Sequence, residues 1–206
     1  MSLEGLCMSS KVSIETRSKI IEAALRIIAQ EGFQSVTTRK IAAQADVNIA
    51  LLHYHFGSKE NIINEALSKL TGEYVELFEH LKAGELKPKE RLKVFFFGYS
   101  EVTLRYPDII KNFVANSIYS YPTQSNYIGF IQKQGLDLLK ATVKEMNVPD
   151  DDTQIVLKLV QILSGIAFPV LLGAALETIS GINFEDQEVR YQYIGLLIDA
   201  LFPVKG

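Results

Sequence analysis

Residues 37–59 read TTRKIAAQADVNIALLHYHFGSK, and their spacing of small, apolar and polar residues predicts two short helices joined by a tight corner. Thr37 or Thr38 can cap a helix that runs to about Ala45, because a hydroxyl accepts a bond from the free N–H groups of a first turn. Ile41 shares the buried stripe of that helix. Ala42 is small where the next helix has to cross closely. The stretch therefore begins with the first helix of a helix-turn-helix.

The corner and the second helix follow at once. Asp46 begins the corner, and aspartate is one of the few residues other than glycine that tolerate a left-handed backbone. Asn48 is placed to cap the second helix. In that helix Leu51 or Leu52 recurs at helical spacing with Phe56, so one side is fixed in the core. The other side carries polar and aromatic side chains that have no core to enter.

An exposed helix held at a short turn by a scaffold helix is the device that presents side chains to the major groove of DNA. We expect Thr38, His53 and Lys59 to lie mainly on phosphates, and Arg39, Ile49 and Ala50 to lie nearer to base edges. The complete set expected at the DNA surface is Thr38, Arg39, Asn48, Ile49, Ala50, His53, Tyr54, His55 and Lys59. Arg17 and Lys19 lie on an earlier helix. They either contact phosphates as well or are simply charged side chains in solvent.

The stretch resembles the DNA-binding segment of the TetR-like transcriptional regulators. Their pattern is a threonine-rich cap, Ile-Ala, a Gly-Val corner and an aromatic cluster that ends in Phe-x-Ser-Lys. The chain has Asp46 where the family usually has glycine, and His53 where it usually has a tyrosine that touches a phosphate. The resemblance implies a homodimeric regulator, most often a repressor, that binds a palindromic double-stranded operator and is released by a small effector.

Two other functions are kept as alternatives. One is an architectural DNA-binding protein without an effector, and the other is a helical enzyme. The sequence has no H-E-x-x-H, G-x-S-x-G, Walker, Rossmann or C-x-x-C pattern, so no enzymatic activity and no cofactor are expected. His53 and His55 are two residues apart, which directs them to different sides of a helix and argues against a shared metal ion.

Composition is that of a globular chain, with 48% hydrophobic and 22% charged residues in 206 positions. The single cysteine, Cys7, excludes a disulfide framework and fits a cytoplasmic location. The net charge of −3 is unevenly spread, because residues 1–59 carry seven basic and five acidic side chains. A mildly basic N-terminal part on an acidic body suits a protein that meets phosphate at one end. Residues 1–10 do not resemble a signal peptide and are left out of the fold.

Helical patterns recur along the rest of the chain, and no strand-like alternation is sustained, so the predicted fold class is all-α. The expected helices cover residues 13–31, 37–45, 48–56, 59–81, 88–106, 108–118, 126–146 and 187–202, with a loop at 119–125. Ser13 is the expected cap of the first. We divide the chain into an N-terminal three-helix DNA-binding head, residues 11–59, and a helical effector-binding and dimerisation body, residues 60–206. The helix after Ser58 crosses this border, so the head and body are rigidly joined.

Aromatic residues with a few polar neighbours gather on three of the expected body helices. Such a set either forms plain core or lines a pocket for a small hydrophobic or aromatic effector. The candidate pocket residues are Phe96, Tyr99, Thr103, Tyr106, Phe113, Asn116, Tyr127, Phe130 and Gln134.

The stretch Leu159–Leu176 has no charged residue and is nearly long enough to span a membrane. Gln161, Ser164 and the internal Pro169 argue against insertion, and a helix that is apolar all round is otherwise a buried one. With the last helix it offers more apolar surface than one subunit is expected to cover, so we predict a homodimer interface there and no membrane partner. The residues assigned to this interface are Gly165, Gly173, Ala174, Ile194, Leu197, Ile198 and Leu201.

Overall fold

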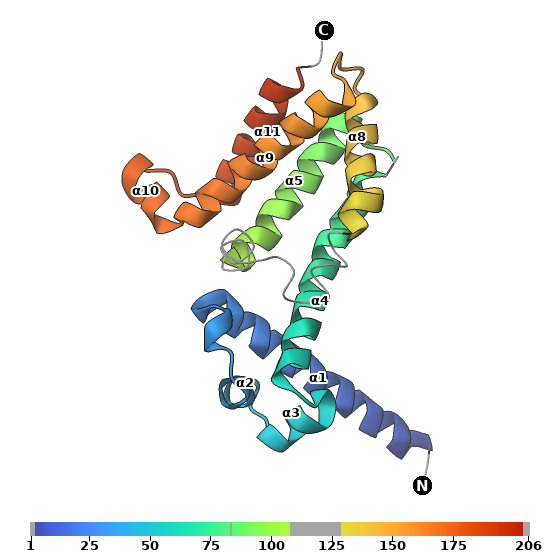
Figure 1. Cartoon of the computed structure of the whole chain (residues 1–206), viewed down its shortest axis with the longest axis vertical. Helices are drawn as coiled ribbons and strands as arrows, with labels where there is room; N and C mark the ends of the chain where they lie inside the picture. The colour runs from blue at the N-terminus through green and yellow to red at the C-terminus, as the bar shows by residue number, and fades with distance from the viewer. Residues whose placement is uncertain (1–2, 83, 108–128, 204–206) are drawn as a thin grey trace.

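The computed structural model describes residues 3–82, 84–107 and 129–203, with side chains described from Ser13 onward. Every regular element in these ranges is helical, so the all-α prediction is confirmed. Figure 1 shows the N-terminal helices grouped at one end and the later helices grouped at the other, with α4 running between the two groups. The helix expected at 108–118 and the loop expected at 119–125 lie outside the described residues.

Around the N-terminal core, the three helices of the predicted head pack with a short 3-10 turn and with α4, the helix that leads into the predicted body. They are α1 (Leu3–Glu31), the turn Phe33–Ser35, α2 (Thr38–Ala45), α3 (Ile49–Phe56) and the first half of α4 (Lys59–Leu77). The expected start of the first helix at Ser13 is wrong, because α1 already begins at Leu3. The preceding residues include good helix formers, and a serine inside a helix need not act as a cap.

The chain then passes from α4 into the 3-10 turn Phe78–Leu81, and these two elements complete the helical stretch expected over 59–81. It continues with α5 (Pro88–Arg105), a π-helical turn (Ile131–Gly135) leading into α8 (Leu136–Lys144), α9 (Asp152–Leu172), α10 (Ala174–Ser180) and α11 (Gln187–Leu201). Pro88 stands in the first turn of α5, where its missing N–H costs nothing.

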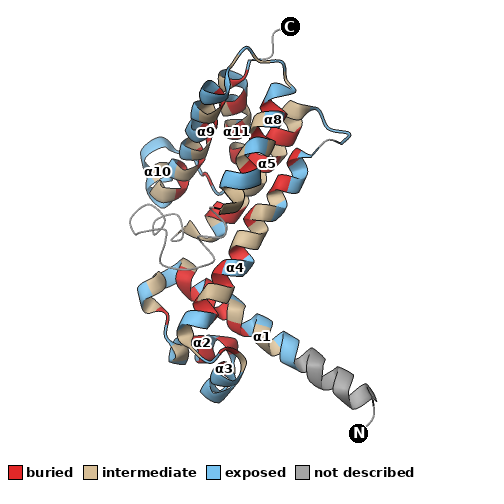
Figure 2. Cartoon of the chain, turned by 45° about the vertical axis from the view of Figure 1, so that its right-hand side comes forward, coloured by how far each residue is buried: buried red, intermediate tan, exposed pale blue. Residues whose placement is uncertain are grey.

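Two hydrophobic cores share α4. The head core contains the buried stripe of α1 with Ile20, Ile27 and Ile28, and it takes in α2, α3 and the first part of α4 down to Tyr74. The body core contains Phe78, which directly continues α4, together with residues of α5, α8, α9 and α11. The buried residues in Figure 2 follow α4 from one group of helices into the other. Because one helix belongs to both cores, the head is held on the body without a flexible linker.

The end of α4 that lies farthest from the head is tied down by polar contacts. The backbone carbonyl of Leu81 accepts bonds from Arg91 Nη1 on α5 at 2.6 Å and from Thr142 Oγ1 on α8 at 3.3 Å. Arg91 also pairs with Glu145, and its own side chain is only 4% exposed. Nearer to the head, Gly98 of α5 lets α4 and α5 approach closely, because a Cβ at this position would lie 2.6 Å from Leu77 Cδ2.

The contact between α9 and α11 corrects part of the predicted dimer interface. Ile194 and Ile198 are 1% and 0% exposed, because α11 turns them into the body core. A Cβ on Gly165 would lie 3.1 Å from Leu197 Cδ1 of the same chain, and Tyr193 donates a hydrogen bond to the Gly165 carbonyl. The assignment is therefore wrong for Ile194 and Ile198, and Gly165 serves packing within the subunit.

Helix α9 contains most of the uncharged stretch. It is long and apolar enough to cross a membrane by length and composition alone. Ile155, Leu159, Ile162 and Ile166 of this helix are buried in the body core against α5 and α11. One side of α9 is therefore packed in the core of the helical body.

Candidate nucleic-acid interface

The scaffold helix α2 begins as its sequence predicts. Of the two candidate caps, Thr37 is the one used, since its Oγ1 accepts the Lys40 N–H at 3.2 Å. Ile41, Ala42 and Ala45 are buried, so one face of α2 is fixed in the head core. Lys40 is on the outer side, where its Nζ pairs with Glu31 at 2.5 Å.

Asp46 makes the corner in the left-handed conformation, with φ 54° and ψ 50°. The backbone N–H of Val47 donates to the Ala42 carbonyl at 3.0 Å and closes the turn. Val47 itself is half-buried and packs against the head core. The aspartate therefore does at this corner what a glycine would do, with its side chain in solvent.

Helix α3 starts at the predicted cap, because Asn48 Oδ1 accepts the Ala50 N–H at 2.9 Å. Leu52 and Phe56 are 1% and 5% exposed, whereas Leu51 is 39% exposed. The inward member of the leucine pair is thus Leu52. This register decides which side chains of α3 face solvent.

The residues assigned to DNA occupy the solvent side of these helices. Arg39, Asn48, Ile49, Ala50, His53 and Tyr54 are exposed, and Thr38, His55 and Lys59 are half-buried. Tyr54 is 81% exposed, although a tyrosine ring gains free energy when its apolar part is covered. The structure brings together three short segments: the start of α2, all of α3 and the start of α4.

His53 has a defined tautomer in this arrangement. Its Nδ1 lies 3.1 Å from the carbonyl oxygen of Gly57, and because a carbonyl only accepts, Nδ1 carries the hydrogen. In the neutral ring Nε2 is then an acceptor. The imidazolium form is needed if Nε2 is to donate to a phosphate, in contrast to a tyrosine hydroxyl, which donates in its ordinary state.

The junction between α3 and α4 is built by local caps. Gly57 has φ 74°, and Ser58 Oγ accepts the Asn61 N–H at 3.2 Å at the start of α4. Asn61 Nδ2 in turn donates to the Phe56 carbonyl at 2.8 Å. These bonds hold Lys59, in the first turn of α4, beside the end of α3.

Arg17 of α1 has a role that the sequence did not indicate. Its Nη1 donates to the His55 carbonyl at 2.8 Å, its Nη2 pairs with Glu65 of α4, and its guanidinium lies 4.5 Å from the centre of the Phe56 ring. One side chain thus joins three helices at the end of α3. We call this group of contacts the Arg17 clamp. Its partners are 38 and 48 residues away, so no local pattern could have revealed it.

A second link joins α1 to α4 nearby. Lys69 Nζ lies 3.2 Å from Glu22 Oε1, and hydrogen bonding to Lys69 lowers the pKa of the Glu22 carboxyl from its ordinary value. Both groups are largely exposed, so this pair adds little stability compared with the buried stripe of α1. Within the described residues, no group of His, Cys, Asp and Glu side chains is arranged to hold a metal ion.

The predicted effector-pocket residues divide into three groups. Tyr99 and Thr103 face α4, where Thr103 Oγ1 lies 3.2 Å from the Tyr74 hydroxyl, and burial raises the pKa of Tyr99. Phe96 is fully buried in the body core, and Phe130 packs on Phe78 with 5.2 Å between ring centres. Tyr106 is half-buried and Gln134 is exposed, while Phe113, Asn116 and Tyr127 lie outside the described residues. The predicted pocket stays a prediction.

Comparison with known proteins agrees with this geometry. Residues 20–66 match the model of the bacterial regulatory proteins of the TetR family. The chain is 34% identical over 84 residues to the HTH-type transcriptional regulator BetI of Rhizobium meliloti, which covers 40% of this chain and 41% of BetI. It is 24% identical over 143 residues to the HTH-type transcriptional repressor KstR2 of Rhodococcus jostii, covering 66% and 69%. It spans about a third to just under half of the length of several other curated relatives.

The whole architecture also has a counterpart among solved structures. A crystal structure of a transcriptional regulator from Rhodococcus sp. Rha1 superposes with a TM-score of 0.67 at 18% identity, covering 90% of this chain and 95% of that one. At such low identity this similarity shows the fold alone. The family match in sequence is to residues 20–66, which contain the helix-turn-helix. The chain is therefore TetR-like: residues 20–66 are similar to the helix-turn-helix segment of that family, and the helical fold is that of a solved regulator.

Proposed function

We propose that this chain is a homodimeric repressor that binds a palindromic operator through α3 and leaves it when a small effector binds the helical body. The observation that carries the proposal is the solvent-facing side of α3, which is held rigidly by the buried Leu52 and Phe56 and by the Arg17 clamp. A helix whose inner side is fixed in this way presents its outer side chains with little loss of conformational entropy on binding.

The DNA contacts divide by chemistry. Arg39 and the small α3 residues Ile49 and Ala50 suit base edges in the major groove, because arginine can pair in a bidentate manner with guanine and a small apolar side chain can meet a thymine methyl group. Lys59 and Thr38 suit phosphates, which position the head without reading sequence. His53 suits a phosphate in its protonated form.

Dimerisation is supported by apolar side chains that remain exposed on the two longest helices at the C-terminal end. Leu157, Val160 and Phe168 of α9 are 58%, 51% and 62% exposed, and Leu196 of α11 is 69% exposed. Several large apolar residues left open on adjacent helices mark an interaction surface. A two-fold pair built on this face would match a two-fold operator.

Release from DNA is expected to pass through α4. Its first half is packed in the head, and its second half contacts α5 through the Tyr74–Thr103 bond and through the ion pair of Glu73 with Arg105 at 2.8 Å. A ligand that shifts α5 therefore acts on α4, since close-packed interiors transmit displacement. The operator affinity changes 5- to 150-fold if the ligand favours the released arrangement by about 1–3 kcal/mol.

The test is an operator search with purified protein. DNA recovered from a random library after repeated binding should contain a palindrome, and protection from nuclease should be confined to it. Uniform protection without a consensus would instead support the architectural alternative. The enzyme alternative would require turnover of a substrate that is lost when a histidine or carboxylate is replaced.

A further inference from the structure

A cavity of about 350 Å³ lies at the base of the body, where the ends of α5 and α9 meet α10 and the segment that leads into α11. None of its described lining residues belongs to the aromatic set on which the effector prediction rested. Its size is within the range of pockets that hold small organic ligands. Its walls come from residues that are far apart in sequence.

The walls are mainly apolar. Leu104 contributes from the end of α5 and Pro107 from just after it, Pro169 and Val170 contribute from the end of α9, and Phe184 contributes from the segment before α11. Val170 and Phe184 are only 4% and 7% exposed, so they form a firm surface inside the cavity. A ligand that fills this space therefore needs an apolar body.

The charged residues among the described lining are all negative. Glu177 of α10 and Glu185 of the following segment are lining residues, and no Lys or Arg is among those described. No described cation pairs with either carboxylate. Arg190, which donates to the backbone carbonyl of Glu185, is paired with Glu101 of α5. Two carboxylates beside apolar walls attract a cation and repel an anion.

We propose that this cavity binds a small organic cation with an apolar body, of the class of quaternary or tertiary amines. The cation would lie between Glu177 and Glu185, and its apolar part would lie against Val170 and Phe184. The identification of this ligand as the effector rests on the proposed repressor function. The binding itself does not.

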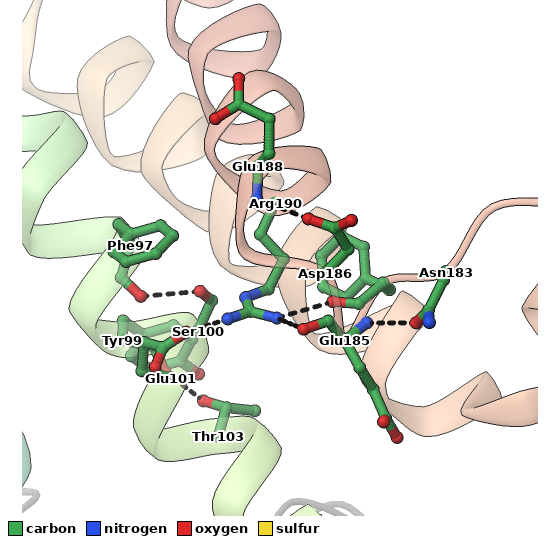
Figure 3. A network of polar contacts seen from close by, with 11 residues as sticks. Phe97, Tyr99, Ser100, Glu101, Thr103, Asn183, Glu185, Asp186, Glu188 and Arg190 are labelled. Carbon is green, nitrogen blue, oxygen red and sulfur yellow. Dashed lines mark hydrogen bonds and ion pairs between the residues drawn. The ribbon is translucent and has the colours of Figure 1, made fainter.

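The segment before α11, which forms one rim of the cavity, is held in place by Arg190. Arg190 Nη1 donates to the carbonyls of Phe184 at 2.9 Å and Glu185 at 2.6 Å, and Arg190 Nη2 pairs with Glu101 (Figure 3). The segment before α11 is therefore fixed on α5. The Glu185 side chain stays available because only its backbone is used in these bonds. Its backbone N–H is also taken, by Asn183 Oδ1 at 2.8 Å.

The position of the cavity suits control of the DNA-binding head. Leu104 and Pro107 flank Arg105, which pairs with Glu73 of α4, and Thr103 on the same turn contacts Tyr74. A ligand in the cavity would thus press on the part of α5 that contacts the connecting helix. The lining residue Leu104 thus lies within one helical turn of Thr103 and Arg105, the two α5 residues that contact α4.

The experiment uses benzyltrimethylammonium as the probe and measures its affinity for the full-length protein by calorimetry, without DNA. Benzenesulfonate, similar in size but negative, is the control ligand. The variants are Glu177→Gln and Glu185→Gln, with Glu85→Gln as a matched control, because Glu85 is an exposed carboxylate in the loop before α5. Ala174→Phe fills the cavity without changing charge.

We expect saturable binding of the cation, weakened about three- to fivefold by each of the two Gln substitutions and unchanged by Glu85→Gln. Ala174→Phe should abolish binding, and benzenesulfonate should not bind. Circular dichroism confirms that each variant is folded. The assignment is overturned if no saturable binding occurs at millimolar probe, or if all three Gln variants bind equally.

A second arm separates this assignment from the proposed function. Affinity for the selected operator is measured with and without saturating probe. A fall in operator affinity identifies the cavity as the effector site. Probe binding with unchanged operator affinity would refute the release mechanism and leave the cation site intact.

Discussion

Replacement of Arg17 by alanine tests whether one side chain of α1 fixes the recognition helix. The change removes the bond to the His55 carbonyl, the ion pair with Glu65 and the contact with the Phe56 ring. The two charged side chains are 41% and 33% exposed, so the ion pair contributes only about 0.2–1 kcal/mol. The ring contact adds about 0.5–1 kcal/mol, and the bond to the carbonyl adds about 1 kcal/mol.

The sum predicts that Arg17→Ala lowers the free energy of unfolding by about 2 kcal/mol. Urea unfolding followed by circular dichroism measures it, at one protein concentration for all variants because a dimer's stability depends on concentration. Operator affinity should fall by about fivefold, because the end of α3 then has to be ordered on binding. Arg17→Lys should give an intermediate loss of stability, since an ammonium cannot make all three contacts at once.

Lys19→Ala is the matched control. Lys19 is exposed on the same helix and also carries one positive charge. If Arg17 acted only as a phosphate contact, the two alanine variants would lose DNA affinity alike and would keep the stability of the parent protein. A loss of less than about 0.5 kcal/mol in Arg17→Ala would refute the clamp, because that is the scatter of ordinary surface substitutions.

The remaining predictions concern base reading, assembly, the corner and pH. Arg39→Ala should cost about 1–3 kcal/mol of operator binding and relax the preference at one base position, measured by competition with single-base operator variants. Leu196→Glu should convert a dimer to monomers in sedimentation, whereas a parent protein that is already monomeric would contradict the assembly. Asp46→Gly should leave the melting temperature nearly unchanged, but Asp46→Val should lower the stability by about 1–2 kcal/mol, since Cβ branching opposes a left-handed backbone. Hydrogen bonding to Lys69 lowers the folded pKa of Glu22, so the ion pair contributes stability that is fully present above the unfolded pKa of this carboxyl and is lost as the pH falls through the folded pKa. Lys69→Met should therefore lower the free energy of unfolding at neutral pH but not in acid; equal acid sensitivity of both proteins would contradict this.

Local chemistry explains why the head could be predicted from sequence. The caps at Thr37 and Asn48 and the left-handed Asp46 depend on residues within four positions, and each occurs where the sequence placed it. The fold class followed from helical periodicity in the same way. These features need no knowledge of distant parts of the chain.

The features that were missed depend on tertiary partners. Ile194 and Ile198 look equally apolar whether they face a second subunit or the body core, and only the packing of α11 on α5 and α9 decides between these. The Arg17 clamp joins residues of three helices. The base cavity likewise needs α5, α9 and α10 to be placed together before its lining exists.

In the proposed release mechanism α4 would act as a lever whose fixed point is the carbonyl of Leu81, at the end of the 3-10 turn that follows the helix. Bonds from Arg91 and Thr142 hold the end that lies away from α3, so under the proposed release mechanism the helix would turn about that end. From Lys59 to Leu77 it has 19 residues, and at about 1.5 Å per residue the arm is about 28 Å long. A rotation of about 7° at the fulcrum would then carry the head about 3.5 Å sideways, and in a two-fold dimer both heads would move, against a half-site spacing of about 34–36 Å. In the proposed mechanism, a small rotation of α4 at its fixed end would thus move each recognition helix far enough to misalign it with its half-site.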